Sequence, residues 1–136
     1  MNPKQPILLV ENDLIDIMTV KRALRDLDIQ NPLHVAKNGE EGLEKLASFE
    51  NELPAFILLD LNMPRMDGFE FMQIIKKDER LKMLPVIVLT TSKQYDDRLR
   101  SFEQSVAGYM VKPVDYKQFV DVIQTIHLYW TMSELP

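Results

Sequence analysis

The chain contains no cysteine, which excludes disulfide bonds, zinc–thiolate sites and thiol catalysis. It also has no apolar segment near the roughly 20 residues that cross a bilayer, and the first six residues do not have the pattern of a signal peptide. We therefore expect a cytoplasmic protein with no membrane segment. Lys and Arg are scattered and the net charge is −5, so nucleic-acid binding by electrostatic attraction is not expected.

Histidine and glycine are also scarce. His34 and His127 are the only two histidines, and neither has a partner at the spacing of metal ligands, so neither is a candidate site residue. The four glycines do not form a phosphate-binding loop after the first apolar run. This absence argues against a flavodoxin-like cofactor carrier.

Five short apolar runs alternate with helical patterns along the whole chain. Alternation with short connections predicts an α/β fold with a parallel sheet and helices on both faces. A length of 136 residues fits a single domain, 1–136, with its core at about 6–127 and a C-terminal extension at about 128–136. The expected strands are 7–10, 33–36, 55–59, 86–89 and 107–111.

Helix starts are marked by a polar capping residue followed three positions later by a second polar residue. Asp13 with Asp16 is one such start, and it opens an apolar pattern made by Leu14, Ile17, Val20, Leu24 and Leu27. The fourth helix is predicted from one stripe of Tyr95, Leu99 and Phe102. The other capping pairs are Asn38 with Glu41, Asp67 with Glu70, and Asp115 with Gln118.

Polar residues follow the predicted strands where the strands end. Because parallel strands all end at one edge, and ligands bind at that edge, we expect these side chains to lie together. Carboxylates are ligands for Mg²⁺ (magnesium), and a carboxylate can attack phosphorus to form an acyl phosphate. A lysine and a hydroxyl can bind phosphoryl oxygens. The residues concerned are Glu11, Asn12, Asp60, Thr90 and Lys112.

Four motifs in this order and spacing resemble the receiver domains of two-component response regulators. They are Val10-Glu11-Asn12, Asp60-Leu-Asn-Met-Pro-Arg-Met-Asp-Gly68, Leu89-Thr90-Thr91-Ser92 and Gly108-Tyr109-Met-Val-Lys112-Pro113. The resemblance covers nearly the whole chain. It implies a doubly wound, flavodoxin-like receiver fold with five helices and a five-stranded parallel sheet in the order 2-1-3-4-5.

The resemblance also implies a role for each matching residue. Asp60 would be the phosphoryl acceptor, which takes the group from a histidine kinase, and the chain would catalyse only its own phosphorylation and dephosphorylation. Mg²⁺ would be held by Glu11, Asn12, Asp60 and the backbone carbonyl of Asn62. The remaining matches are Lys112 as partner of the acceptor and then of the phosphoryl group, Thr90 and Tyr109 as switch residues, and Pro113 as a structural proline after a cis peptide bond.

The sequence departs from the family pattern at Asn12, where the family normally has a second acid. An amide brings no negative charge, so we expect weaker Mg²⁺ binding unless the neighbouring Asp13 compensates. One alternative is therefore a pseudo-receiver, a binding module that no longer uses phosphorylation. Another is a small aspartyl-phosphate hydrolase, but such enzymes need an Asp at the position of Asn62.

The C-terminal segment adds aromatic residues after the last helical pattern. Together with the Val-Glu opening, it is similar to the small stand-alone regulators associated with phytochromes, so a phytochrome is one candidate for the histidine kinase. Tyr129 and Trp130 predict either a helix end that covers its own core or anchors of a homodimer. The expected dimer face combines the fourth helix, fifth strand, last helix and tail. Output would then pass to an unknown downstream protein or phosphotransfer partner.

Overall fold

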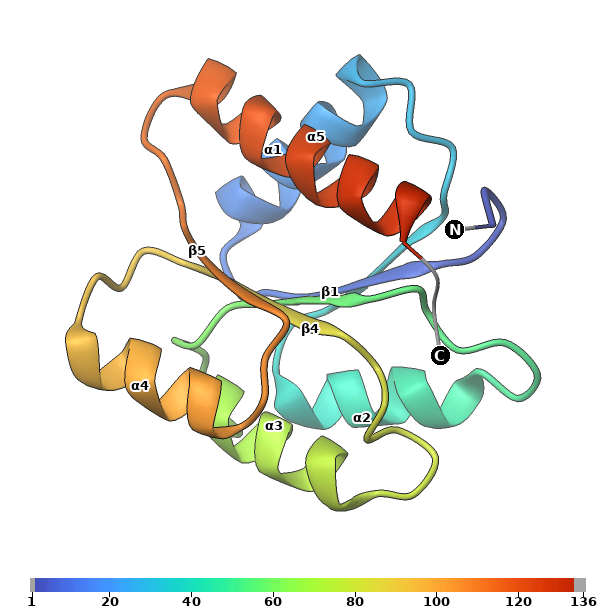
Figure 1. Ribbon diagram of the computed structural model, residues 1–136, viewed down its shortest axis with the longest axis vertical. Helices are drawn as coiled ribbons and strands as arrows, with labels where there is room; N and C mark the ends of the chain where they lie inside the picture. Colours follow the sequence, from blue (N-terminus) through green and yellow to red (C-terminus); the bar gives the residue numbers. More distant parts are fainter. Residues whose placement is uncertain (1, 134–136) are drawn as a thin grey trace.

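The computed structural model describes residues 2–133 and forms a three-layered α/β structure (Figure 1). All strand pairs are parallel and the strand order is β2-β1-β3-β4-β5, which confirms the predicted fold. Within residues 2–133, no helix has the length and apolarity needed to cross a membrane. The elements are β1 Ile7–Val10, α1 Leu14–Asp26, β2 Leu33–Ala36, α2 Gly39–Ser48, β3 Ile57–Leu59, α3 Gly68–Lys77, β4 Val86–Thr90, α4 Tyr95–Glu103, β5 Gly108–Val111 and α5 Tyr116–Met132.

Helices cover both faces of the sheet. Figure 1 shows α1 and α5 on one side of the sheet, with α2, α3 and α4 on the other. Alternate side chains of β1 enter different cores, because successive residues of a strand point to opposite faces. Ile7 and Leu9 pack with α1 and α5, whereas Leu8 and Val10 pack with α2 and α3. The central strands are buried on both faces, as their uninterrupted apolar runs predict.

Four of the five helices begin at the predicted capping residues. Asp13 Oδ1 accepts hydrogen bonds from the backbone N–H groups of Ile15 and Asp16, at 2.8 and 3.2 Å. Such bonds satisfy donors that have no partner within the helix. The caps of α2, α3 and α5 are Asn38, Asp67 and Asp115.

Helix α4 differs from the others in packing and capping. Its first flanking residue, Gln94, makes no side-chain capping bond, and Ser101 is its only buried residue. The predicted stripe of Tyr95, Leu99 and Phe102 is present but faces solvent. The exposed fractions of the surfaces of these three residues are 65%, 45% and 53%. The apolar period therefore located the helix without revealing which face would be covered.

Two further differences from the sequence-based expectations concern element ends. Strands β3 and β5 begin later than predicted, at Ile57 and Gly108. Leu14 was expected on the buried stripe of α1, but it is 64% exposed. As the first residue of the helix, it lies beyond the strand ends that would have covered it.

The predicted C-terminal extension begins as a continuation of α5, which reaches Met132. The Trp130 ring stacks on Phe56 with centroids 6.3 Å apart and joins the core between the sheet, α1 and α5. Trp130 therefore covers the chain's own core, whereas Tyr129 is 63% exposed. Residues 134–136, the end of the predicted extension, lie outside the described residues.

Candidate functional site

Two of the predicted strand-end residues, Glu11 and Asp60, place their carboxylates near the ammonium group of a third, Lys112. Lys112 Nζ, after β5, lies 2.6 Å from Glu11 Oε2, after β1, and 3.9 Å from Asp60 Oδ1, after β3. The Lys112 side chain is only 7% exposed. Burying an ammonium costs several kcal/mol, on the order of what short charge-assisted bonds to carboxylates can offset. The parallel sheet thus brings together charges that are 101 residues apart in sequence.

Asp60 is held firmly through its backbone, while one of its carboxylate oxygens has no partner. Its N–H donates to the carbonyl of Val10 at 3.0 Å. A Cβ at Gly68 would lie 2.9 Å from the Asp60 carbonyl oxygen, so only glycine permits this close approach of α3. Asp60 Oδ1 is buried and accepts no hydrogen bond within residues 2–133. Its separation from Lys112 Nζ is too long for a hydrogen bond.

The electrostatic environment changes the proton affinity of two groups. Burial raises the pKa of Glu11 to about 6, and the nearby Asp60 adds to this rise, while the hydrogen bond from Lys112 opposes it. Burial alone would lower the pKa of Lys112, but its bonds to Asp16 and Glu11 outweigh burial and raise that pKa. Lys112 is consequently a fixed positive charge in this site.

The remaining predicted metal ligands lie next to these groups in the chain. Asn12 directly follows Glu11, and Asn62 lies two residues after Asp60; both are exposed at the sheet edge. Asp13, the possible replacement for the missing acid, uses Oδ1 to cap α1. The partnerless oxygen of Asp60 and the buried Glu11 carboxylate fit a cation such as Mg²⁺. Within residues 2–133, no three acidic or histidine side chains form a complete metal cage, so amide, carbonyl and water oxygens would complete the ligand set.

Thr90 and Tyr109 lie on the neighbouring strands β4 and β5. Thr90 is fully buried, and its carbonyl accepts the backbone N–H of Lys112 at 2.7 Å. Tyr109 is half-buried, and its hydroxyl donates to the carbonyl of Ser92 at 3.0 Å. The segment after Thr90 is therefore tied to the ring of Tyr109.

The prediction for Pro113 was wrong in one respect. Residues 2–133 contain no cis peptide bond, so the bond between Lys112 and Pro113 is trans. The two isomers of such a bond differ by only about 1 kcal/mol or less. A proline at this position does not by itself determine the isomer.

The sequence did not reveal Asp16 as a partner of Lys112. Asp16 Oδ2 lies 2.8 Å from Lys112 Nζ. This distance is slightly longer than that of Glu11 Oε2, at 2.6 Å, and much shorter than that of Asp60 Oδ1, at 3.9 Å. The sequence signal was its position five residues after Glu11, on the first turn of the helix that leaves this edge. The capping pattern with Asp13 accounts for an acid at position 16 in the sequence without any contact to Lys112.

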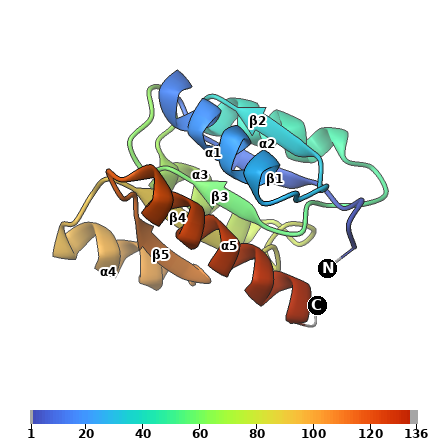
Figure 2. The same ribbon diagram turned by 90° about the horizontal axis from the view of Figure 1, so that it is seen from above.

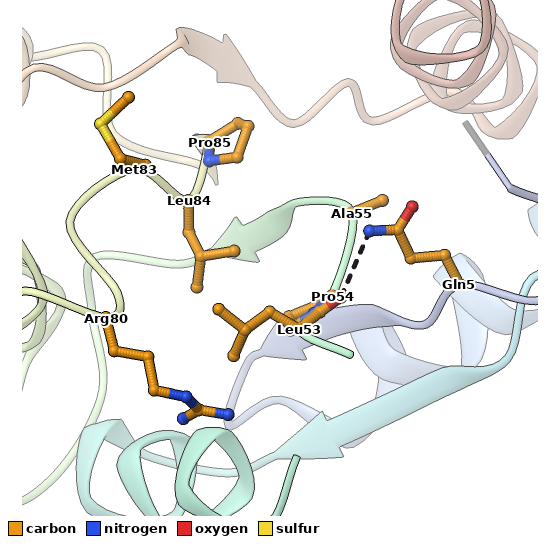
Figure 3. Close-up of a pocket in the computed structure, with 8 residues that line it drawn as sticks. All are labelled: Gln5, Leu53, Pro54, Ala55, Arg80, Met83, Leu84 and Pro85. Atoms are coloured by element: carbon orange, nitrogen blue, oxygen red, sulfur yellow. Dashed lines mark hydrogen bonds between the residues drawn. The ribbon is translucent and has the colours of Figure 1, made fainter. Parts of the chain in front are cut away.

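Two hollows flank opposite ends of the sheet. One, of about 380 Å³, is lined by Ile15, Asp16, Lys112 and Val114 among others, so it opens beside the site. The other, of about 330 Å³, lies at the amino ends of β3 and β4 (Figure 3). There the guanidinium of Arg80 donates to the carbonyls of Leu46 and Phe49. Since its one charged group is engaged, this second hollow offers no evident chemistry.

Comparison with known proteins gives consistent results. The model of the response regulator receiver domain matches residues 7–124. The response regulator Rcp1 of a Synechocystis strain is 37% identical over 133 residues, which cover 95% of this chain and 90% of Rcp1. The solved structure of the phosphorylated cyanobacterial phytochrome response regulator RcpA has a TM-score of 0.89 at 32% identity, covering 98% and 99% of the two chains. The Mn²⁺-bound form of Rcp1 has a TM-score of 0.86 at 34% identity, covering 97% and 99%.

Proposed function

The chain belongs to the response regulator receiver domain family, and from this premise we propose that it accepts a phosphoryl group on Asp60. The donor is the phosphohistidine of a histidine kinase, and the reaction depends on Mg²⁺. The phosphorylated chain then signals by contact with another protein. His34 and His127, the two histidines of the given sequence, are not among the residues paired with Lys112, so the proposed donor histidine is neither of them.

The observation that carries this proposal is the state of Asp60 Oδ1. A buried carboxylate oxygen without a hydrogen bond is costly to a fold, and such costs are concentrated at functional sites. This oxygen accepts no hydrogen bond within residues 2–133, and the ammonium of Lys112 lies 3.9 Å away. The Asp60 carboxylate therefore has bonding capacity left for a cation and for phosphorus.

In the proposed step, an oxygen of Asp60 attacks phosphorus as the P–N bond of the donor breaks. The electron pair of that bond remains on the imidazole nitrogen, and a P–O bond replaces it. Lys112 and the hydroxyl of Thr90 bind the phosphoryl oxygens. Attack by water on the same phosphorus later restores Asp60 and releases inorganic phosphate.

The carboxylates of Glu11 and Asp60, the amide oxygen of Asn12 and the backbone carbonyl of Asn62 would hold Mg²⁺. When bound, the ion supplies positive charge that neutralises the phosphoryl oxygens in the transition state. The relative Rcp1 was crystallised with Mn²⁺, an ion that takes the same oxygen ligands.

Thr90 and Tyr109 would connect the site to the output face. Movement of the Thr90 hydroxyl toward a phosphoryl oxygen would disturb the segment that ends at Ser92, whose carbonyl binds Tyr109. Phosphorylation would thus shift a pre-existing equilibrium of α4, β5 and α5. The output partners in this proposal are a second copy of the chain and a downstream protein or phosphotransfer partner.

The kinase would dock beside the hollow that opens at Lys112. Leu14, Ile15 and Met18 on the first turns of α1 are 64%, 75% and 59% exposed, and Val114 after β5 is fully exposed. Exposed apolar side chains gathered next to a reactive group mark an interaction surface. Phytochromes are candidate kinases because the structural relative RcpA is a phytochrome response regulator.

The proposal is tested by incubating the chain with acetyl phosphate and Mg²⁺ and measuring its intact mass. We expect one added phosphoryl group in the wild type, and none in Asp60→Asn or after chelation of Mg²⁺. A wild type that gains no mass would contradict the proposal and favour the phosphorylation-independent binding module. Equal labelling of Asp60→Asn would place the acceptor elsewhere.

A further inference from the structure

Lys112 has one more acidic neighbour than the proposed ligand set includes. Its ammonium bonds Glu11 Oε2 at 2.6 Å and Asp16 Oδ2 at 2.8 Å, and Asp60 Oδ1 lies at 3.9 Å. Glu11 and Asp60 belong to the proposed metal and phosphoryl site. Asp16 does not, because its carboxylate is 32% exposed and lies on the helical side of the lysine.

The charge of the site depends on Asp16. Asn12 occupies the position where the family normally has an acid, so the proposed ligand set is one negative charge short. With Asp16 included, three carboxylates face one ammonium and the net charge is minus two. This equals the net charge of a site with two acids, the acceptor aspartate and the lysine.

We propose that Asp16 is a positioning residue that restores the charge lost at Asn12. It does so through Lys112, by balancing the ammonium with a carboxylate outside the ligand set. Glu11 and Asp60 then keep their negative charge for a divalent cation. The inference rests on the proposed function, since it concerns the affinity of the same site for Mg²⁺.

A simpler role for Asp16 would be a favourable charge near the amino end of α1. That role requires no contact with Lys112 and would be served equally by a side chain pointing to solvent. The short bond to a lysine that is 7% exposed distinguishes the two roles. The bond also raises the pKa of Lys112, so the ammonium and the carboxylate are directly coupled.

The test is the Mg²⁺ dissociation constant, measured by titration calorimetry without a phosphoryl donor. Asp16→Asn retains the size of the side chain and an acceptor for Lys112, so we expect it to fold. Loss of one unit charge near the divalent ion should weaken binding by at least about fivefold, the effect expected even when the two charges are screened as they are in bulk water. Asp26→Asn is the matched control, because it removes the same charge about 15 Å along the same helix.

The double variant Asn12→Asp with Asp16→Asn separates charge compensation from other roles. If Asp16 replaces the missing acid, this variant should bind Mg²⁺ within about twofold of the wild type. An unchanged dissociation constant for Asp16→Asn overturns the inference, as does a loss that Asn12→Asp does not restore or a wild type without measurable binding. Labelling of the wild type by acetyl phosphate decides the proposed function separately, because charge compensation is scored by binding alone.

Discussion

Asp60 combines two properties that normally lower the stability of a fold. Its carboxylate is buried, and Oδ1 has no hydrogen-bond partner within residues 2–133. Glu11 adds a second buried carboxylate, and the single ammonium of Lys112 bonds Glu11 rather than Asp60. Replacing the Asp60 carboxylate with a neutral amide should therefore relieve the repulsion between Asp60 and Glu11.

We expect Asp60→Asn to raise the free energy of unfolding by about 1–2 kcal/mol, because it removes an incompletely paired buried charge. Urea denaturation of the wild type and the variant measures the difference. Asp121→Asn on the exposed surface of α5 is the control, and its stability should change by less than about 0.5 kcal/mol. A less stable Asp60→Asn would show that the carboxylate contributes to the fold and would contradict the explanation.

Individual residues of the site differed in how well the sequence revealed them. Residues that directly follow an apolar run, such as Asp60 and Lys112, were predictable because parallel strands end at one edge. Asp16 lies on a helix, and no strand pattern predicts the direction of its side chain. Its pairing with Lys112 joins residues 96 positions apart and required the crossing of α1 over the sheet to be known.

At the level of elements, α1 presents two different surfaces. Ile17, Val20, Ala23 and Leu24 are buried against the sheet and α5, whereas Ile15 lies at the mouth of the hollow beside Lys112. An exposed isoleucine at this place has no evident role in the fold. We therefore propose that Ile15 contributes to the docking of the proposed kinase.

Ile15→Ser should slow phosphoryl transfer from a histidine kinase about tenfold, as expected when one apolar anchor is lost from an interface. Labelling by acetyl phosphate should be unchanged, because a small donor needs no docking surface. The two rates are measured with a purified kinase that phosphorylates the wild type and with acetyl phosphate. Met83→Ser is the control, since Met83 is 63% exposed at the opposite edge of the sheet. Docking at Ile15 would be contradicted if Ile15→Ser slowed transfer from the kinase and from acetyl phosphate equally, or if it slowed neither reaction.

Capping chemistry explains why most helices were predictable and α4 less so. Asp13, Asn38, Asp67 and Asp115 mark the starts of their helices because their side-chain oxygens accept hydrogen bonds from backbone N–H groups of the first turn. The helix at α4 has no such residue, and Gln94 leaves its start uncapped. Its apolar stripe predicted a helix, but the surrounding layers determine which face is covered.

At the level of the whole molecule, alternation of strands and helices predicted a parallel sheet but not its strand order. The order came from the resemblance to receiver domains, because short connections allow several windings of the same elements. That order makes β5 an edge strand beside β4. It therefore leaves α4, β5 and α5 on one side of the molecule, as Figure 2 shows.

Both α4 and α5, the helices on either face of the sheet near β5, carry exposed apolar side chains. Leu99 and Phe102 on α4 are 45% and 53% exposed, and Leu128 and Tyr129 on α5 are 50% and 63% exposed. Apolar exposure on neighbouring elements is typical of a surface that a partner covers. We propose that a second copy of the chain covers it after phosphorylation.

Light scattering after size-exclusion chromatography should then give twice the monomer mass for the wild type treated with beryllofluoride and Mg²⁺. Leu99→Arg should remain monomeric under the same conditions, because a charge would be buried without a partner in the interface. Asp60→Asn should also remain monomeric, whereas Met83→Arg at the opposite edge should dimerise like the wild type. A treated wild type that stays monomeric, or a Leu99→Arg variant that dimerises equally, would exclude this face as the dimer interface. Because Leu99 is not part of the phosphoryl site, its variant should still be labelled by acetyl phosphate, which separates loss of the interface from loss of the chemistry.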